Sequence, residues 1–332
     1  MSNVVRLPIA RPAPRSIQSR KMRQVLSSTA NYVHELGACR TPGDLAGWVY
    51  YKAPTFFPLR AYPSVINLEV TNHCNFACPH CPRSALNKGR ELGHMDFEVF
   101  RKLVDESAGR ARQFRFIGLG EPCLHPRFGD MMRLLKTAGL KARPYTNGTL
   151  FETFAPEEIL SWALEEIVVS IDGVDARSFE RLRVGGKFDA LYRALETFEV
   201  ARKASNEPRT RIQVRHVIMP TETPAQLAAF ARFWRSRFAD SVKFNLLGEA
   251  YDRPRAGAQW RPSCRDIRRE MHIRHDGRVP LCGYAGDREW IGDVAAASVE
   301  SIWLSDRLQE VRRLHQNRDL TTIGFCKTCQ FW

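Results

Sequence analysis

Short apolar runs alternate with longer amphipathic segments along most of the chain after Val65. The runs that read as buried strands are residues 65–70, 113–118, 141–145, 166–171, 209–219 and 241–247. Helical spacing of apolar residues falls between them, at residues 96–107, 128–138, 156–163, 188–204 and 223–238. Repeated strand–helix units favour a parallel sheet covered by helices, with ligands at the carboxyl ends of the strands. Because a closed barrel needs about eight strands, we predict an α/β fold built on a partial (βα)6 TIM-like barrel.

Changes in this pattern divide the sequence into three predicted domains. Residues 1–63 form a basic, partly disordered N-terminal extension, rich in Pro and Arg at its start. The partial barrel takes residues 64–250, and residues 251–332 form a small C-terminal domain. In that last domain we expect a hairpin at residues 271–282, around an Asp-Gly turn, and one helix at residues 299–315.

Composition narrows the class of protein. The chain has 332 residues, 44% of them hydrophobic and 26% charged, which is typical of a globular protein. Its net charge is +14, and residues 1–63 hold nine Lys and Arg against two Asp and Glu. A basic balance favours acidic partners or a phosphorylated substrate, although it can equally serve solubility alone. The segment of residues 48–62, which is rich in aromatic residues and Pro, either covers a flank of the main domain or touches a membrane surface.

Targeting signals are the next observation. The sequence has no apolar run of about 18 residues and no apolar segment near its start. We therefore expect no transmembrane segment and a cytoplasmic location. In a reducing compartment, the nine cysteines are expected to be metal ligands more often than disulfides.

Three of those cysteines follow the first predicted strand directly. Cys74, Cys78 and Cys81 are spaced C-x3-C-x2-C, so their thiolates can converge on one metal centre at the carboxyl end of the sheet. An ordinary iron–sulfur cluster wants four protein ligands, and three leave one iron open to a cofactor or substrate. A zinc knuckle completed by His73 or His80 is the alternative on these residues alone.

This loop, with several later motifs in the same order, resembles the radical S-adenosylmethionine (SAM) superfamily. The motifs are Leu119-Gly120-Glu121-Pro122 after the second strand, Thr146-Asn147-Gly148-Thr149 after the third, Ser170-Ile171-Asp172-Gly173 at the end of the fourth, and Arg183-Val184-Gly185-Gly186-Lys187-Phe188-Asp189 beyond it. Leu119 departs from the family pattern, which has Gly there. The resemblance implies a [4Fe–4S] cluster on the three cysteines, SAM on its open iron, and a 5′-deoxyadenosyl radical formed by reductive cleavage.

The resemblance also implies which residues contact SAM. Those residues are His80, Gly120, Glu121, Asn147, Ser170, Arg183 and Val217. Glu121 would lie beside the amino group of the methionine part, and Ser170 and Arg183 would hold the carboxylate or ribose. His80 and the backbone near Val217 would lie near the adenine. A flavodoxin- or ferredoxin-type protein would donate the electron.

A second set of cysteines lies in the C-terminal domain. Cys264, Cys282, Cys326 and Cys329 are separated by 17, 43 and 2 residues. Four thiolates can fully ligate one cluster, which leaves electron transfer or structural support as its use. The spacing resembles the twitch domain, a shortened SPASM domain with one auxiliary [4Fe–4S] cluster. A structural zinc site is the alternative.

The twitch-like spacing is similar to that of aminocyclitol (2-deoxy-scyllo-inosamine) dehydrogenase. We therefore interpret the chain as a radical SAM oxidoreductase that dehydrogenates or epimerises a small-molecule substrate, a polar sugar or cyclitol type, either free or phosphorylated. A peptide-modifying SPASM-type maturase is the alternative. We expect no stable nucleic-acid partner, because no aromatic-basic stacking motif is present.

Candidate catalytic residues rest on position alone. Glu249 and Arg253 follow the last predicted strand, where a base or a substrate contact would lie. Cys123 directly follows the Glu121-Pro122 motif. Its thiol either returns a hydrogen atom to a substrate radical, as an epimerase requires, or is simply a small buried hydrophobe.

Overall fold

A seven-stranded, wholly parallel sheet forms the framework, with strand order β6-β5-β4-β3-β2-β1-β7. It is seen in a computed structural model that describes residues 59–83, 89–205, 210–246, 264, 266–317, 319–320 and 322–329. The strands are β1 (Val65–Leu68), β2 (Gln113–Phe116), β3 (Lys141–Thr146), β4 (Glu166–Ser170), β5 (Arg211–Ile218), β6 (Ser241–Leu246) and β7 (Glu270–Ile273). The predicted α/β partial barrel is confirmed, and the six predicted strands are its first six.

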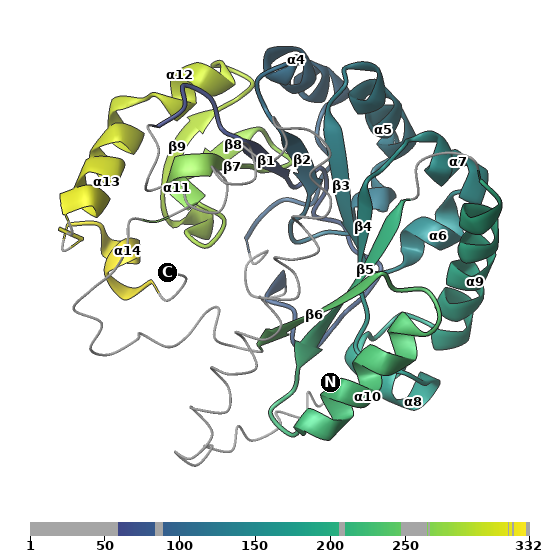
Figure 1. The fold of residues 1–332 in the computed structure, drawn as a ribbon. Coiled ribbons are helices and arrows are strands. Elements are labelled where there is room, and N and C mark those ends of the chain that lie inside the picture. Colours follow the sequence, from purple (N-terminus) through teal and green to yellow (C-terminus); the bar gives the residue numbers. More distant parts are fainter. Residues whose placement is uncertain are drawn as a thin grey trace. The chain divides into compact units, whose positions relative to one another are not determined.

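Helices cover the outer side of these strands (Figure 1). They are α4 (Phe97–Ser107), α5 (Phe128–Thr137), α6 (Thr149–Thr153), α7 (Pro156–Ser161), α8 (Ala176–Leu182), α9 (Phe188–Ala204) and α10 (Pro224–Arg235). The short helices α6 and α8 were not predicted. Asp175 begins α8 with a capping box, in which its Oδ1 accepts a hydrogen bond from the Ser178 amide at 2.7 Å.

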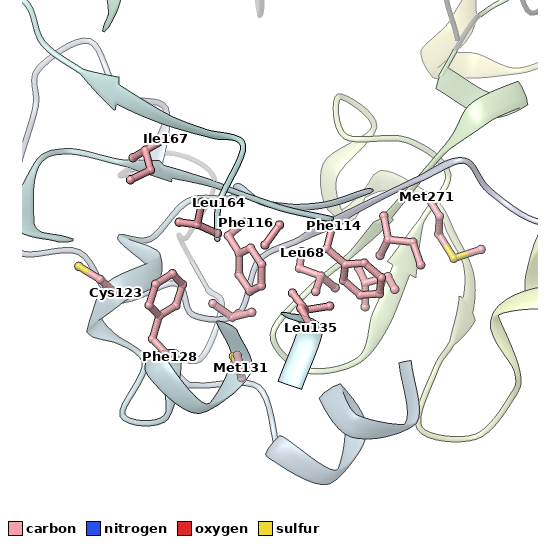
Figure 2. Packing of buried hydrophobic residues seen from close by; sticks show 14 of the residues in the cluster. Leu68, Phe114, Phe116, Cys123, Phe128, Met131, Leu135, Leu164, Ile167 and Met271 are labelled. Atoms are coloured by element: carbon pink, nitrogen blue, oxygen red, sulfur yellow. The ribbon is translucent and has the colours of Figure 1, made fainter. Parts of the chain in front are cut away.

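Alternation along the strands separates an apolar outer face from a polar inner face. In β2, Phe114 and Phe116 are fully buried, and both pack within 6.4 Å of the Phe100 ring. Figure 2 shows them with Phe128 in the cluster beneath the helices. The intervening residue, Arg115, faces the other way, because successive strand residues point to opposite sides. The inner face is thus free for polar chemistry.

The C-terminal region departs from the prediction in two places. β7 does not form a hairpin with β8 (Arg278–Pro280): it joins the large sheet beside β1, and β8 pairs antiparallel with β9 (Trp290–Asp293). The Asp-Gly turn does form, and Gly277 takes a φ of +85° there. Because the turn leads out of one sheet and into another, a local pattern could not show the partner strand.

The single helix expected at residues 299–315 is two helices, α12 (Val299–Trp303) and α13 (Asp306–Asn317). The other elements of this region are α11 (Asp266–Arg269), η4 (Gly286–Arg288) and α14 (Gly324–Thr328). The break between α12 and α13 is held from the side, since the buried Arg312 guanidinium donates to the carbonyl oxygens of Trp303 and Ile267. The two boundaries between the three domains stay predictions, and residues 1–58 lie outside the described residues.

Candidate functional site

One cavity of about 380 Å³ opens among the loops after β1, β2 and β3 and the ends of β4 and β5. It is lined by all three cysteines of the first loop and by five of the seven predicted SAM-contact residues. These eight residues are Cys74, Cys78, Cys81, Gly120, Glu121, Asn147, Ser170 and Arg183. His80 and Val217 do not line it. Residues scattered over more than a hundred positions of the sequence therefore meet at the carboxyl edge of the sheet.

The cysteine loop is held open toward this cavity by neighbouring backbone. The Ala77 amide donates to the carbonyl oxygen of Val184 at 2.8 Å, which ties the loop to the segment after α8. Gly185 has a φ of +103°, and a Cβ there would lie 2.8 Å from the carbonyl oxygen of Asn75. Glycine is required at this position because the two backbones approach so closely.

Two side chains direct N–H groups at the cysteine sulfurs. Asn147 Nδ2 lies 3.9 Å from Cys74 Sγ, and Arg183 Nη1 lies 3.9 Å from Cys78 Sγ. Burial raises the pKa of both thiols, and the positive charge of Arg183 acts against this at Cys78. Donors aimed at sulfur favour the thiolate form, which is the form that binds iron. The donor set therefore fits a thiolate-ligated cluster.

Glu121 is 2% exposed and is positioned by the loop after β3. Its Oε2 accepts a hydrogen bond from the Asn147 amide at 2.6 Å, and burial raises the pKa of its carboxyl group. Before it, Gly120 has no room for a side chain: a Cβ would collide with the carbonyl oxygens of Thr71 and His73. This part of the motif is fixed by backbone packing, whereas Leu119 lines the cavity and its amide donates to Glu69 Oε2 at 2.9 Å.

Asp172 lies behind the cavity lining and positions Arg183, which lines it, although the sequence pointed to Ser170. Its side chain is buried, and its Oδ2 lies 2.6 Å from Arg183 Nη2 and 3.2 Å from His80 Nε2. Its Oδ1 accepts from the Val217 amide at 2.7 Å. His80 and Val217 thus reach the site through Asp172. The signal available in the sequence was a carboxylate placed just past a strand end.

Charges around Asp172 set two pKa values. Burial alone would raise the pKa of Asp172, but hydrogen bonds from His216 and His80 and the charge of Arg183 hold it well below its usual range. His216 lies between Asp172, at 3.2 Å, and Glu222, at 2.9 Å. Burial would lower the pKa of His216, but these two carboxylates raise it to about 9. At neutral pH the imidazole is therefore charged.

The predicted catalytic residues are not gathered at this cavity. Cys123 is 4% exposed, does not line the cavity, and donates its S–H to Glu121 Oε1 at 3.2 Å. Burial raises the pKa of its thiol well above the usual range. Figure 2 shows it with the apolar side chains of the core. Glu249 and Arg253 lie outside the described residues.

The cavity also has lining residues that the sequence did not single out, Arg215 and Tyr145 among them. Arg215 lies on β5 and its guanidinium sits 4.8 Å from the centre of the Tyr145 ring on β3. The available signal was strand alternation, which places Arg215 on the same inner face as Gln213.

The second cysteine set lines a separate, smaller cavity of about 20 Å³. Its four members are Cys264, Cys282, Cys326 and Cys329. The Ala285 amide donates to Cys282 Sγ at 3.3 Å, and the buried His315 has its Nε2 3.4 Å from Cys326 Sγ. Burial raises the pKa of the Cys282 and Cys326 thiols to about 12.

Four such thiols share one space, as a cluster ligated only by protein requires: Cys264 precedes α11, Cys282 follows β8, Cys326 lies in α14 and Cys329 follows it. None of the eight described cysteines forms a disulfide. Over the described ranges, no three His, Cys, Asp or Glu side chains converge on a position for a single metal ion.

No helix in the described part of the chain is long and apolar enough to cross a membrane.

Two known protein families match the two regions that hold the cysteine sites. Residues 68–233 match the radical SAM superfamily, and residues 264–330 match the SPASM family, an iron–sulfur cluster-binding domain. The chain is 32% identical over 142 residues to an AdoMet-dependent heme synthase of Methanosarcina barkeri, covering 43% of this chain and 40% of the synthase. It is 26% identical over 236 residues to the mycofactocin maturase MftC of Mycobacterium tuberculosis H37Rv, covering 70% and 54%.

Two solved structures share the fold. BtrN in complex with AdoMet and 2-DOIA gives a TM-score of 0.53 at 17% identity, covering 80% of this chain and 92% of BtrN. Streptococcus suis SuiB bound to the precursor peptide SuiA gives a TM-score of 0.62 at 12% identity, covering 86% and 73%. The chain spans between 30% and 54% of the length of these curated relatives.

The family match covers half of the chain and coincides with the cavity built on β1 to β5. The second match covers all four cysteines of the smaller cavity. Proteins with these domains bind a [4Fe–4S] cluster with SAM in the first and auxiliary iron–sulfur clusters in the second. The chain belongs to the radical SAM superfamily and carries a C-terminal iron–sulfur cluster-binding domain of the SPASM family.

Proposed function

We propose that this chain is a radical SAM oxidoreductase that dehydrogenates a small polar substrate of the sugar or cyclitol type, either free or phosphorylated. The observation that carries the proposal is the pairing of two different cysteine sites. Three thiols share a roomy cavity with residues suited to SAM, whereas four thiols enclose a small one. Three ligands leave an iron for SAM, and four leave none, so the second site is suited to accept an electron.

In this proposal Cys74, Cys78 and Cys81 hold the first cluster, and Cys264, Cys282, Cys326 and Cys329 hold an auxiliary [4Fe–4S] cluster. When bound, the first cluster and SAM supply a 5′-deoxyadenosyl radical that removes a hydrogen atom from the carbinol carbon. A flavodoxin- or ferredoxin-type protein supplies the electron that this requires.

In this proposal the chain's own residues bind and orient SAM and the first cluster. The Glu121 carboxylate, fixed by the Asn147 amide, is placed to accept the ammonium of SAM. Arg183, held by Asp172 and directed at Cys78 Sγ, would hold the carboxylate or ribose of SAM. His80 and the Val217 backbone support that arrangement through Asp172. Asn147 and Arg183 both favour the thiolate state of the loop.

Oxidising an alcohol to a ketone also requires that a proton and an electron leave. We assign the proton to Glu249 and the electron to the auxiliary site, with Arg253 as a substrate contact; both residues follow β6 in the sequence. Epimerisation would instead need a hydrogen-atom donor beside the substrate. Cys123 is turned toward Glu121 and is outside the cavity lining, and this favours dehydrogenation.

A peptide-modifying maturase is the second candidate, because the chain resembles MftC over 70% of its length and shares its fold with SuiB. The discriminating experiment uses the anaerobically reconstituted enzyme with a reductant and a small-metabolite extract, with and without peptidase digestion. We expect 5′-deoxyadenosine formation that survives digestion, with a product two hydrogens lighter than its precursor. Loss of the stimulation after digestion would establish the peptide alternative.

Three variants complete that experiment. Cys78→Ala should abolish deoxyadenosine formation, and persistence would refute the assignment of the first site. Cys123→Ala should leave dehydrogenation intact, whereas a stalled reaction would show that the thiol donates a hydrogen atom. Cys282→Ala should lower the iron content from about eight to about four atoms per chain and stop product formation, because the electron then has no acceptor.

A further inference from the structure

The inner face of the sheet is rich in arginine, and one arginine differs from the rest. Arg215 lies on β5 in register with Ser170 of β4 and Lys243 of β6, so the three occupy one level of the inner face. It lines the cavity together with Ser170 and the three cysteines of the first loop. Its side chain is therefore within the space where SAM and substrate meet.

Two carboxylates elsewhere on the inner face already have arginine partners. Glu166 is paired with Arg143, and Arg211 Nε lies 3.9 Å from the same carboxylate. Glu270 is paired with Arg115 at 3.2 Å. Each of these acidic groups is thus already compensated on the inner face.

Arg215, in contrast, has no carboxylate within ion-pair distance among the described residues. Its guanidinium packs on the ring of Tyr145, 4.8 Å from the ring centre, and its buried Nε has no hydrogen-bond partner in the described part of the chain. A cation in a partly dry cavity without a counter-ion costs free energy unless an anion joins it. The arginine fork is suited to the two oxygens of a carboxylate or phosphate.

Tyr145 lies in the positive field to which Arg215 contributes. Its ring lines the same cavity. Burial alone would raise the pKa of its phenol, but the positive charges of Arg143, Arg215, Arg115 and Lys243 lower it to about 8. Positive potential therefore extends over the wall of the cavity and not only over one side chain.

We propose that Arg215, stacked on Tyr145, is the binding subsite for an anionic group of the substrate, a carboxylate or a phosphate, beside the SAM position. The inference rests on the proposed function, in that the substrate reacts in this cavity. It restricts the substrate to acids or phosphate esters and excludes neutral and purely cationic sugars or cyclitols.

The test compares Arg215→Gln with Arg211→Gln in the holoenzyme loaded with SAM. Arg211 is the matched control, because it lies on the same strand and inner face but does not line the cavity. Calorimetric titration with inorganic phosphate in one arm and acetate in the other identifies which anion binds. We expect Arg215→Gln to weaken the binding of that anion by at least about tenfold, because one charge-assisted hydrogen bond is lost. Arg211→Gln should change the same affinity less than about twofold. Arg215→Lys should retain part of the affinity, because it keeps the charge but loses the fork.

Several results would overturn the inference. One is that the wild-type enzyme binds neither anion, and another is that Arg211→Gln loses as much anion affinity as Arg215→Gln. A third is that Arg215→Gln weakens the binding of SAM itself by about tenfold, which would assign Arg215 to the SAM carboxylate. Deoxyadenosine formation by the wild-type enzyme separates the two proposals. Its absence refutes the proposed function, whereas its presence without anion binding refutes the anionic subsite alone.

Discussion

Asp172 and Arg183 meet at 2.6 Å beside the larger cavity, although helix α8 lies between them in the chain. The carboxylate follows β4 and the guanidinium follows α8, so the ion pair closes the loop that contains that helix. Arg183 is thereby directed at Cys78 Sγ, 3.9 Å away. The segment that orients the first cysteine loop is in turn fixed by a residue that need not touch SAM.

Asp172→Asn should therefore weaken SAM binding. Removing one partner of a buried ion pair leaves the other charge uncompensated, at a cost of about 3–5 kcal/mol to stability. We expect SAM affinity to fall by at least about tenfold, measured by calorimetry on the reconstituted protein, with a lower urea midpoint. Asp175→Asn is the control: it keeps a capping side chain on the same loop and should leave SAM affinity unchanged. Unaltered affinity in Asp172→Asn would contradict the positioning role.

Gly120→Ala should disrupt the site through the backbone. The added Cβ would meet the carbonyl oxygens of Thr71 and His73, which precede the cysteine loop, and neither can move as a side chain could. We expect a loss of about 1–3 kcal/mol in unfolding free energy and reduced iron at the first site. Gly324→Ala, whose Cβ would meet nothing within 4 Å, is the matched control. Normal iron loading in Gly120→Ala would show that the strand ends tolerate displacement.

His315→Phe should change the auxiliary cluster without changing the first one. The His315 Nε2 lies 3.4 Å from Cys326 Sγ, and an N–H donor to a cluster sulfur favours the more negative, reduced state. Its removal should shift the auxiliary potential to more negative values in an EPR-monitored titration. The signal of the SAM-binding cluster serves as the internal control. An unchanged auxiliary potential would mean that the imidazole only fills space.

Stability should fall in mildly alkaline solution because of His216. Asp172 and Glu222 raise the pKa of this imidazole from 6.5 to about 9, against the effect of burial. The contribution of the charged imidazole to the free energy of unfolding is complete below pH 6.5 and is lost as the pH rises through about 9. The upper limit of this contribution is about 3 kcal/mol. Urea midpoints measured across this range should decline in the wild type, and His216→Gln should remove that part of the decline. An identical pH profile in the variant would contradict the assignment.

The cysteine sites were predictable because their signals are local or compositional. Cys74, Cys78 and Cys81 lie within one loop, and the strand before them places that loop at the carboxyl edge. Asp172 and Arg215 were missed because their roles depend on which strands are neighbours and on the register between them, as in the pairing of Ser170 with Arg215. Sequence patterns give the face of a residue but not the residue opposite.

The predicted hairpin was wrong for the same reason. The turn at Gly277 was read correctly, yet β7 finds its partner in β1, two hundred positions away. Apolar alternation would have been equally satisfied by either neighbour. The helix at residues 299–315 was divided for a different reason, since Arg312 folds back on the carbonyl of Trp303.

The place of β7 has a consequence for how the chain is made. β1 is an interior strand of the finished sheet, between β2 and β7. Its second edge, which includes Val65, can pair only after Glu270 has been synthesised. During synthesis that edge stays open while nearly the whole barrel emerges, and an open edge invites association with other chains. Cutting away the auxiliary region would expose the same edge, beside the loop that holds Cys74. The C-terminal region therefore completes the sheet that carries the first cysteine loop, and a chain cut after β6 should be more prone to association than the whole chain.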